Sequence, residues 1–535
     1  MSTNTTAHVA EMSVLIVGAG PTGLTLACEL ARRGVDFRIV DKAPAYFAGS
    51  RGKGLQPRSL EVFHDLGLVE KILANGRFHL PFRAYDGTTA IGERDLHEGR
   101  NPTPDVPYAS PLIIPQWRVE EILRGRLAEL GGGKVELATE LVALEQDAEI
   151  VTATLQSADK RHQVRARYVV AADGGRSFVR KHLDVGFEGE TWKDERMLVG
   201  DVHVDRLDRD HWHSWLKHKA GGVALCPFST TDTFQFQAQA PPDMETEPSL
   251  ELFQSIVDER TGRSDLKLYD PTWLSLYRVN VRMVDQYRIG RIFLAGDAAH
   301  VHSPAGGQGM NTGIQDAYNL AWKLSAVLHG ADGALLNTYE EERLPIAASI
   351  LGITTRLHRR AMVDGSQAMK RGPETLQLGL NYRECSLSQQ QDPPATPLSA
   401  GDRAPDAPLR DAKGRDVSLF DVFRGPRFTL LSFSVHDREG LEKLSRKYEP
   451  ELRTYTVDRN APDTSASDTA LFDVHGHASN AYAGENGALF LIRPDGYVGF
   501  IGSGKSIGAI DAYLERVHGR EQTARQDVGF RSSRA

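Results

Sequence analysis

Short apolar runs that end in a glycine-rich turn recur along the first 300 residues. The runs at 13–17, 167–172 and 292–295 are apolar and rich in β-branched residues, which is typical of strands buried on both faces of a parallel sheet. A helical pattern follows each turn. This order of strand, turn and helix predicts an α/β fold with a doubly wound parallel sheet.

The first run leads into a dinucleotide-binding motif. GAGPTG at 18–23 separates the first strand from a helix at 24–33, and a second strand at 35–40 ends at Asp41. Strand, glycine motif, helix, strand and acid stand in the order that this motif requires. The alternative is a glycine turn in an unrelated α/β protein. The motif predicts dinucleotide binding but does not separate NAD from FAD.

Each glycine of this motif has a physical role. Gly18 makes the tight turn, Gly20 lets a pyrophosphate approach the backbone, and Gly23 lets the helix pack on the strand. The helix N-terminus offers free N–H groups to the pyrophosphate. Asp41 is expected to accept a hydrogen bond from a ribose hydroxyl.

Between residues 184 and 282 the pattern changes to a two-residue alternation, most clearly at 233–238. This predicts an antiparallel sheet with one covered face. The segment HWHSWLKHK at 211–219 is expected to be a solvated helix or loop. Five aromatic residues are candidate walls of a ligand site, although core packing is the stronger interpretation for each one: Trp212, Trp215, Phe234, Phe236 and Trp273.

The last third contains helices, a Ser/Gln/Pro-rich stretch and a second α/β pattern. The charged cluster at 338–343 is expected on a solvated helix face, and 387–408 reads as a linker or an extended wrap. The patterns then predict a strand at 428–434, a helix at 438–447, a hairpin through Pro494-Asp495-Gly496 and a final helix at 506–518.

Composition narrows the class of protein. At 535 residues, two or three domains are expected. A net charge of −8 argues against a nucleic-acid partner, and no apolar run is long enough to span a bilayer. The N-terminus lacks the pattern of a secretory signal, and three distant cysteines fit a reducing cytoplasm. His300 and His302 lack a third ligand, so no metal site is expected.

Three motifs together resemble those of the class A flavoprotein aromatic hydroxylases: GAGPTG at 18–23, DGGRSFVR at 173–180, and GDAAH followed by GMNTGIQDA within 296–317. The likeness is greatest to the longer members, which act on phenols, phenylpropionates, polyketides or rifamycin-like antibiotics. It implies a Rossmann-type FAD-binding domain, an antiparallel-sheet substrate domain and a C-terminal thioredoxin-like domain without CxxC. The implied boundaries are 1–184 and 284–385 for the FAD-binding domain and its helical region, 185–283 for the substrate domain, 386–408 for the linker, 409–519 for the C-terminal domain and 520–535 for a flexible tail.

The resemblance also implies which residues bind FAD. Asp41, where most relatives have Glu, would hold the adenosine ribose with Lys42 near the adenine, and Arg51 would meet the phosphates. Gln116 would lie on the FAD face beside Arg118. The full set is Gly18, Gly20, Pro21, Thr22, Gly23, Asp41, Lys42, Arg51, Gln116, Arg118, Asp173, Asp297, Gly309, Met310 and Asn311.

The glycine turn at 306–309 would let the isoalloxazine ring lie against bare backbone. Asp297 would bind the ribityl or pyrophosphate region, and Met310 and Asn311 would offer backbone N–H groups to the ring. The helix that begins near Asn311 would direct its positive end at the reduced flavin anion. A simple hinge between strand and helix is the alternative for this turn.

The chemistry that the resemblance implies belongs to the flavin. NADPH or NADH reduces FAD, dioxygen forms a C4a-hydroperoxide, and an electron-rich aromatic ring takes its distal oxygen. Pro304 would shape the oxygen pocket. His300 is a weaker candidate near the ring, for which a structural place in the turn is favoured. No phenol-activating base is identified.

Other functions remain open at this point. The same architecture suits a Baeyer–Villiger or epoxidising oxygenase, and a flavin-binding protein without turnover is an alternative from another class. The expected partners are a small aromatic substrate and O2, with no nucleic acid and no membrane. A homodimer is one assembly that the resemblance allows.

Overall fold

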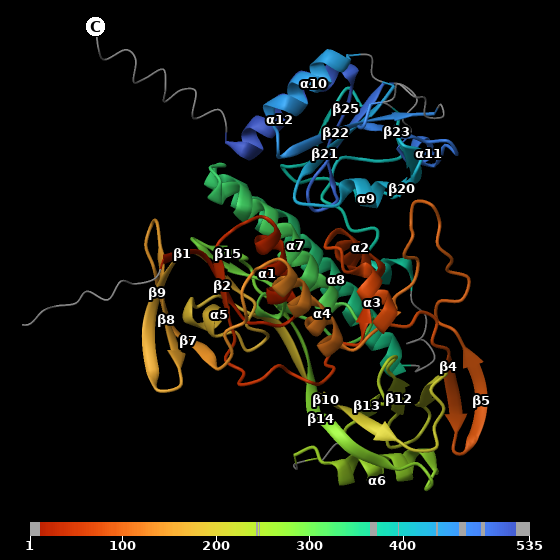
Figure 1. The fold of residues 1–535 in the computed structure, drawn as a ribbon. Helices are drawn as coiled ribbons and strands as arrows, with labels where there is room; N and C mark the ends of the chain where they lie inside the picture. The colour runs from red at the N-terminus through yellow and green to blue at the C-terminus, as the bar shows by residue number, and fades with distance from the viewer. Residues whose placement is uncertain are drawn as a thin grey trace, which may run out of the picture.

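The computed structural model describes residues 11–519 except 242–243, 245–246, 364–371, 394, 435–436, 460–466 and 483–486. Figure 1 shows three sheet-based units, with the C-terminal unit at one end, the antiparallel sheet at the other, and the parallel sheet and its helices between them. The predicted tail at 520–535 lies outside the described residues.

The central unit is built on a seven-stranded sheet whose core is parallel, which confirms the doubly wound prediction. Its apolar strands are buried because helices cover them. The strand order is β15 (Arg288–Ile289), β16 (Ile292–Leu294), β9 (Lys160–Ala171), β1 (Glu11–Val17) and β2 (Phe37–Val40), with β7 (Thr139–Gln146) and β8 (Val151–Ser157) beside β9.

Helix α1 packs against α4 and α7, and α7 also packs against α8. The helices and short strands of this unit are α1 (Pro21–Arg32), β3 (Gly54–Leu55), α2 (Pro57–Asp65), α3 (Val69–Asn75), β6 (Leu112–Ile113), α4 (Gln116–Glu129), α5 (Phe178–His182), α7 (Gly309–Leu328) and α8 (Asn337–Val363). Because β1, β2, β9 and β16 are parallel, the turns after them meet at one edge of the sheet.

The second unit is an eight-stranded, largely antiparallel sheet, as the alternation predicts. Helix α6 (Leu250–Thr261) covers one face, where its apolar residues form a separate core with the strands. The order is β17 (His300–Val301), β14 (Leu268–Met283), β10 (Glu188–Val204), β13 (Phe234–Gln239), β12 (Val223–Pro227), β11 (Trp212–Trp215), β4 (Phe82–Asp86) and β5 (Thr89–Arg94).

The prediction of a solvated helix or loop at 211–219 is wrong for its first half. Residues 212–215 form β11, which pairs with β12 and with the distant strand β4. His213 is fully buried and Trp215 is 2% exposed. The pairing partner lies some 130 residues earlier, so no local pattern reveals it.

The C-terminal unit has its own eight-stranded sheet and core. The predicted hairpin and final helix are confirmed, while the thioredoxin-like likeness stays a prediction. Residues 389–391 add an edge strand, so part of the expected linker wraps onto this sheet. The order is β18 (Gln389–Gln391), β25 (Val498–Ser503), β24 (Ala488–Ile492), β21 (Phe428–Phe433), β22 (Leu452–Asp458), β23 (Ala470–Phe472), β19 (Pro408–Asp411) and β20 (Asp416–Ser418), with helices α9 (Leu419–Phe423), α10 (Arg438–Lys447), α11 (His477–Tyr482) and α12 (Ile507–His518).

The charged cluster at 338–343 does not lie on a solvated face, so that prediction is wrong. Tyr339 and Arg343 are fully buried and Glu342 is 1% exposed. Their partners lie on α7 and in the C-terminal unit. The cluster therefore joins three elements in the interior.

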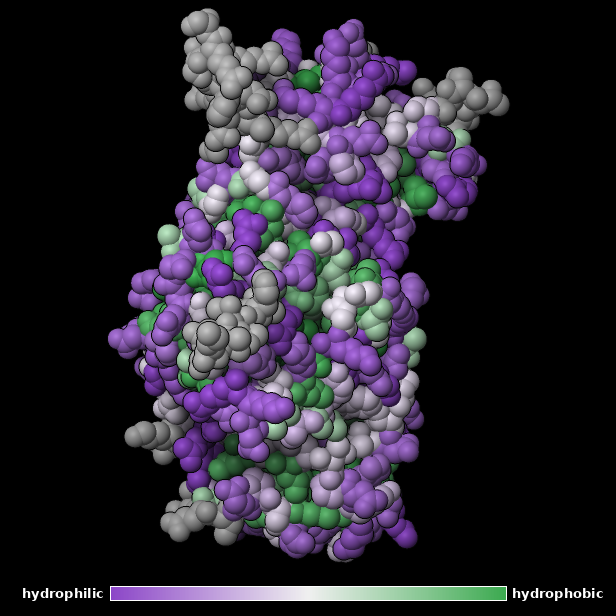
Figure 2. All heavy atoms as spheres, turned by 60° about the vertical axis from the view of Figure 1, so that its left-hand side comes forward, coloured by the Kyte–Doolittle hydropathy of each residue, from purple (hydrophilic) through white to green (hydrophobic). Residues whose placement is uncertain are grey.

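Hydrophilic side chains predominate on the face drawn in Figure 2, with apolar atoms in scattered patches. Across the part of the chain that the structure describes, no helix combines the length and the apolar character that crossing a membrane requires.

Candidate cofactor and active site

The turn between β1 and α1 is shaped by close approaches of backbone to backbone. Gly18 has φ of 105°, and a Cβ there would lie 2.2 Å from Ala172 O. A Cβ at Gly23 would lie 2.0 Å from Gly18 O. At Gly20 a Cβ would meet nothing within 4 Å. Two glycines are thus required by packing, and the third faces open space.

Thr22 brings the first and third motifs together. Its Oγ1 would lie 2.5 Å from a Cβ at Gly296 and 2.4 Å from one at Gly313. The second motif joins them, because Arg180 donates hydrogen bonds to Ala298 O and to its own turn at Gly175 O, both at 2.8 Å. Segments nearly 300 residues apart therefore form one continuous surface.

Two predicted cofactor acids also organise backbone. Asp41 accepts hydrogen bonds from the N–H groups of Ala19, at 2.7 Å, and Ala43, at 2.8 Å. Each of its oxygens keeps a further lone pair for a ribose hydroxyl. The neighbouring Lys42 is exposed.

Asp173 ties the second motif to the start of α5. One of its oxygens accepts a hydrogen bond from Phe178 N at 2.8 Å, whereas its other oxygen is buried and has no hydrogen-bond partner among the described residues. Burial raises the pKa of this carboxyl.

Gln116, at the first position of α4, holds the loop before β3. Its Oε1 accepts a hydrogen bond from Gly52 N at 3.0 Å, and its Nε2 donates to Glu120. Met310 lies at the same place, with its Cε 3.6 Å from a Cβ built on Gly52. The structure thus brings together two residues that the sequence places on the FAD face.

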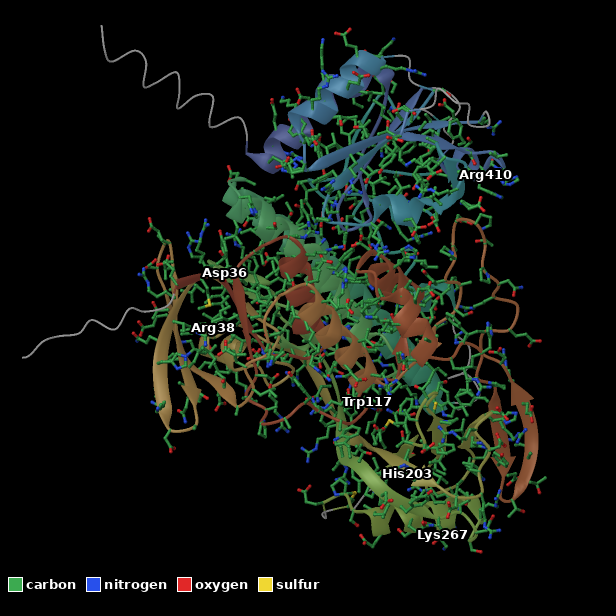
Figure 3. All side chains as sticks on the ribbon, in the orientation of Figure 1. Asp36, Arg38, Trp117, His203, Lys267 and Arg410 are labelled. Carbon is green, nitrogen blue, oxygen red and sulfur yellow. The ribbon has the colours of Figure 1, made fainter. Side chains whose placement is uncertain are left out.

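Among the described residues, Arg118 and Arg51 contact neighbours in their own segments and not the glycine turns. Arg118 forms an ion pair with Glu121 and stacks over Trp117. Figure 3 places Trp117 at the end of α4 nearest the antiparallel sheet. Arg51 is exposed, 4.6 Å above the Phe47 ring.

The N-terminus of α7 is open to an anion. The helix begins at Gly309, two residues before the expected start, with no side-chain cap and no acid in its first turn. A Cβ at Gly309 would meet nothing within 4 Å, and Pro304 and Gly307 are exposed. Unpaired N–H groups at such an end favour negative charge.

The side chain of Asn311 is engaged by backbone. Its Oδ1 accepts a hydrogen bond from Gln56 N at 2.7 Å, and its Nδ2 donates to Gly54 O and Gly307 O. Only the backbone of Asn311 is therefore available to a ring.

Asp297 lies in a concave region. It is exposed by its accessible area, yet the surrounding protein raises the pKa of its carboxyl. The carboxyl is therefore closely surrounded by protein and still open to solvent, so a ligand can reach it. Tyr277 lies nearby, since Asp297 adds to the effect of burial in raising the pKa of the Tyr277 hydroxyl. Tyr277 donates to His302 O at 3.1 Å.

His300 is held by a buried ionic cluster rather than directed at the open surface. Its Nε2 lies 2.7 Å from Asp316, which also accepts from Arg343 Nε at 2.8 Å and Gly296 N at 3.0 Å. Burial by itself raises the pKa of Asp316, but Arg343 and His300 outweigh it and lower the pKa to about 2. Asp316 thus stays ionised and fixes the turn.

We expect His300→Ala to lower the free energy of unfolding by about 1–3 kcal/mol, because Asp316 loses one buried partner. The rate of product formation per bound FAD should stay within about twofold, since Arg343 and Gly296 still hold Asp316. Thermal unfolding and turnover normalised to flavin absorbance check both parts. A large loss of turnover per flavin at unchanged stability would instead assign His300 to the chemistry.

Sequence reasoning missed a second chain of hydrogen bonds beside the glycine turn. Ser303 Oγ lies 2.8 Å from His358 Nδ1, and His358 Nε2 contacts Glu195. The three residues come from the turn, α8 and β10, so only the fold brings them together. His302, whose pKa burial lowers to about 3, has no partner at either ring nitrogen among the described residues.

The five candidate aromatic residues divide between the two faces of the antiparallel sheet. Trp215, Phe234 and Phe236 belong to the core with α6, as core packing predicts. Trp212 and Trp273 lie on the opposite face, against Lys53 and Phe47 of the central unit. That face therefore packs toward the loop that precedes β3.

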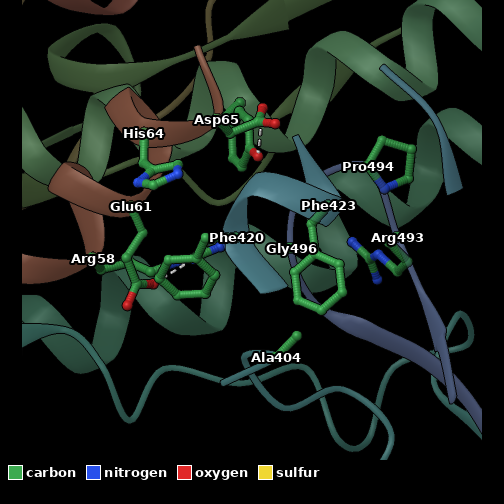
Figure 4. Close-up of a pocket in the computed structure, with 11 residues that line it drawn as sticks. Arg58, Glu61, His64, Asp65, Ala404, Phe420, Phe423, Arg493, Pro494 and Gly496 are labelled. Atoms are coloured by element: carbon green, nitrogen blue, oxygen red, sulfur yellow. Dashed lines mark hydrogen bonds and ion pairs between the residues drawn. The ribbon is translucent and has the colours of Figure 1, made fainter. Parts of the chain in front are cut away.

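A small cavity lies elsewhere, between α2 and the C-terminal unit (Figure 4). Arg58, Glu61 and His64 line one side, and Phe420 and Arg493 line the other. Its volume of about 30 Å³ has room for water only. It is therefore not the cofactor site.

The residues at the parallel-sheet edge fit FAD. Two uncapped helix N-termini meet there, at α1 and α7, and neither has an acid in its first turn. Open space at Gly20 and Gly309 gives a pyrophosphate and a ring access to backbone. The fold and this site together define a dinucleotide-binding α/β protein.

The comparisons identify the family. A sequence model of the FAD binding domain matches residues 11–354, and one of the aromatic-ring hydroxylase C-terminal domain matches residues 397–520. The chain is 43% identical to a flavin-dependent monooxygenase of Mycobacteroides abscessus over 95% of this chain and 100% of that protein. It is 35% identical to the 6-methylpretetramide 4-monooxygenase of Streptomyces rimosus over 94% of this chain and 93% of the relative.

A solved structure agrees with these relatives. The complex of aklavinone-11 hydroxylase with FAD and aklavinone superposes with a TM-score of 0.78 at 26% identity, covering 96% of this chain and 100% of that one. The chain belongs to the FAD-dependent aromatic-ring hydroxylases and is a monooxygenase of aromatic compounds.

Proposed function

We propose that this monooxygenase hydroxylates a phenolic ring of a polyketide-like compound, with NADPH or NADH as electron donor and O2 as oxygen donor. The near full-length similarity to the 6-methylpretetramide 4-monooxygenase carries the proposal. The mixed aromatic and amide character of the sheet face toward the central unit supports it, since Trp212 and Trp273 offer flat apolar area while Gln237 offers a hydrogen-bonding amide.

The residues predicted from sequence take the following roles in this proposal. The first motif and Asp41 hold the adenosine and pyrophosphate, with Lys42 and Arg51 beside them. Asp297 and the backbone of residues 309–311 hold the flavin half. Bound FAD supplies the redox chemistry.

The chain's own contribution is electrostatics and exclusion of water. The N-terminus of α7 stabilises negative charge on a reduced ring by about 0.3–2 kcal/mol. The antiparallel sheet covers the site and keeps water from the ring. Pro304 borders the same opening.

A labelled-oxygen assay tests the proposal. Holoenzyme is given NADPH or NADH, 18O2 and a panel that contains 6-methylpretetramide, aklavinone and pentachlorophenol. We expect one panel member to stimulate oxidation of the nicotinamide and to gain one 18O atom as a ring hydroxyl. An ester oxygen or an epoxide in the product would replace hydroxylation by the Baeyer–Villiger or epoxidising alternative. Oxidation that no aromatic compound stimulates, without labelled product, would contradict the proposal.

We further infer a reducing cytoplasmic setting and a homodimer. Cys28, Cys226 and Cys385 are free thiols in the described structure, and the first two are buried. Light scattering of the holoenzyme tests the dimer.

A further inference from the structure

Residues 47–53, which we name the Arg51 loop, connect the FAD site with the antiparallel sheet. On the sheet side, Phe47 packs edge-on against Trp273 with ring centroids 5.4 Å apart. Lys53 Nζ donates a hydrogen bond to Gln237 Oε1 at 2.8 Å. On the other side Gly52 is bonded to Gln116 of the FAD-binding unit. The loop is therefore held from both units.

A group of buried polar atoms without partners lies where this loop meets the sheet. Asp201 on β10 and Gln235 on β13 stand directly opposite each other, and Gln235 Nε2 donates to Ser50 O. Asp201, Gln235 and Ser50 are 2%, 1% and 0% exposed. Both oxygens of Asp201, Gln235 Oε1 and Ser50 Oγ lack a well-oriented hydrogen bond among the described residues.

Ser50 nevertheless lies beside Asp201. Burial raises the pKa of Asp201 to about 6, and the polar groups of Ser50 and the charge of Lys53 oppose this rise. Because Ser50 affects the pKa of Asp201, the two residues lie close together, although no well-oriented hydrogen bond joins their side chains.

One proton would satisfy the whole group. An ionised carboxylate accepts only, as does Gln235 Oε1, so the two repel each other. A protonated Asp201 can donate to Gln235 Oε1, while Ser50 Oγ–H donates to the other oxygen of Asp201. Buried polar groups are found paired in native proteins, so the neutral acid is the form that this arrangement fits.

We propose that Asp201 is a positioning residue whose neutral form, together with Gln235 and Ser50, clasps the Arg51 loop to the sheet, and that loss of its proton loosens the loop. The proposal goes beyond the hydroxylation proposed above and depends on neither the substrate nor the electron donor. It matters for FAD because this loop carries Arg51, expected at the cofactor phosphates.

Two other ionisable groups face Asp201, the ammonium of Lys53 and the thiol of Cys226. Lys53 comes from the loop, and its ammonium lies 3.8 Å from the Trp212 ring as well as on Gln237. Cys226 comes from β12, and burial raises the pKa of its thiol to about 11. Asp201 is therefore the carboxylic acid of this group, and its protonation is what we expect to change between acid and neutral pH. Its proton is bound below about pH 6 and lost above it, so the loop is held at acid pH and loosened as pH rises.

Hydrogen exchange of the holoenzyme tests the clasp. Protection of the 47–53 peptide, corrected for the intrinsic pH dependence of exchange, is compared at about pH 5.5 and 7.5. We expect the unmodified protein to lose roughly tenfold protection at the higher pH. Asp201→Asn should stay protected at both, because its amide donates and accepts as the neutral acid does. Asp201→Leu should be loosened at both.

Two further readouts separate the clasp from a general effect on folding. Ser50→Ala removes one hydroxyl and should loosen the loop at the lower pH, with little further change at the higher. FAD release, followed by flavin fluorescence, should quicken with pH more in the unmodified protein than in Asp201→Asn. The unmodified protein and Asp201→Asn share every other ionisable group, Asp297 included. The difference between their rates of FAD release therefore reports on Asp201. An identical pH response of the two proteins would overturn the proposal, whatever the hydroxylation assay gives.

Discussion

Replacing Glu342 by alanine is expected to lower the free energy of unfolding by about 3–5 kcal/mol, because two buried cations then lose their shared partner. Glu342 Oε2 accepts from Lys323 Nζ at 2.6 Å, and the carboxylate accepts from both Nη atoms of Arg493, at 2.6 and 2.9 Å. Burial by itself raises the pKa of Glu342, but Arg493 and Lys323 outweigh it and lower the pKa to about 2. The carboxylate is thus charged at neutral pH.

Chemical denaturation of the two proteins at neutral pH measures this loss. The matched control is Glu439→Ala, which breaks the surface pair of Glu439 with Lys443, whose side chains are 79% and 72% exposed. That control should change stability by less than about 0.5 kcal/mol. A Glu342→Ala protein as stable as the control would show that the two cations find other partners at no cost.

The same network ties the C-terminal unit to helix α7. Asp495, in the turn between β24 and β25, accepts hydrogen bonds from Trp322 Nε1 at 3.1 Å and from Arg493. Trp322 and Lys323 are on α7, the helix whose first turn is proposed to face the flavin. The far half of that helix is therefore fixed by a domain that contributes no predicted cofactor residue. Movement there would displace the helix N-terminus.

The sequence predicts the parts of the site that short-range backbone geometry dictates. Gly23 is required because a Cβ there would lie 2.0 Å from Gly18 O, and Gly18 itself adopts a φ of 105° that favours glycine. Both requirements arise within one turn, and they leave a local motif. The acid that follows each strand is also visible in a short stretch of sequence. Hence the position of the parallel-sheet edge and its turns follows from sequence.

The parts that the sequence misses depend on distant partners. A cluster of charges at 338–343 has the pattern of a solvated face. Burial of Glu342 is tolerable because Lys323 of another helix and Arg493, some 150 residues later in the chain, pair with it. The strand at 212–215 likewise needs β4. No local sequence pattern marks Asp201, because its proposed role depends on Ser50, which lies close to it in the fold and about 150 residues away in the chain.

Replacing Gly20 by leucine is expected to raise the dissociation constant for FAD by at least about 100-fold, or about 2.7 kcal/mol. The first atom of the new side chain has room, since a Cβ at Gly20 meets nothing within 4 Å. Its φ of −74° suits any residue. The leucine would occupy the space before α1 that the pyrophosphate is proposed to fill. Titration of the apoprotein with FAD, followed by fluorescence, measures the change.

Gly18→Ala is the matched control, because it separates a blocked ligand site from a damaged fold. At Gly18 the φ of 105° disfavours alanine, and the new Cβ would lie 2.2 Å from Ala172 O on the neighbouring strand. That variant should lose both FAD affinity and stability of the apoprotein. Gly20→Leu should lose affinity alone, with apoprotein unfolding changed by no more than about 1 kcal/mol, the cost of a poorer N-cap. If Gly20→Leu bound FAD as tightly as the unmodified protein, the pyrophosphate would have to lie elsewhere, and the open space at this turn would need another occupant.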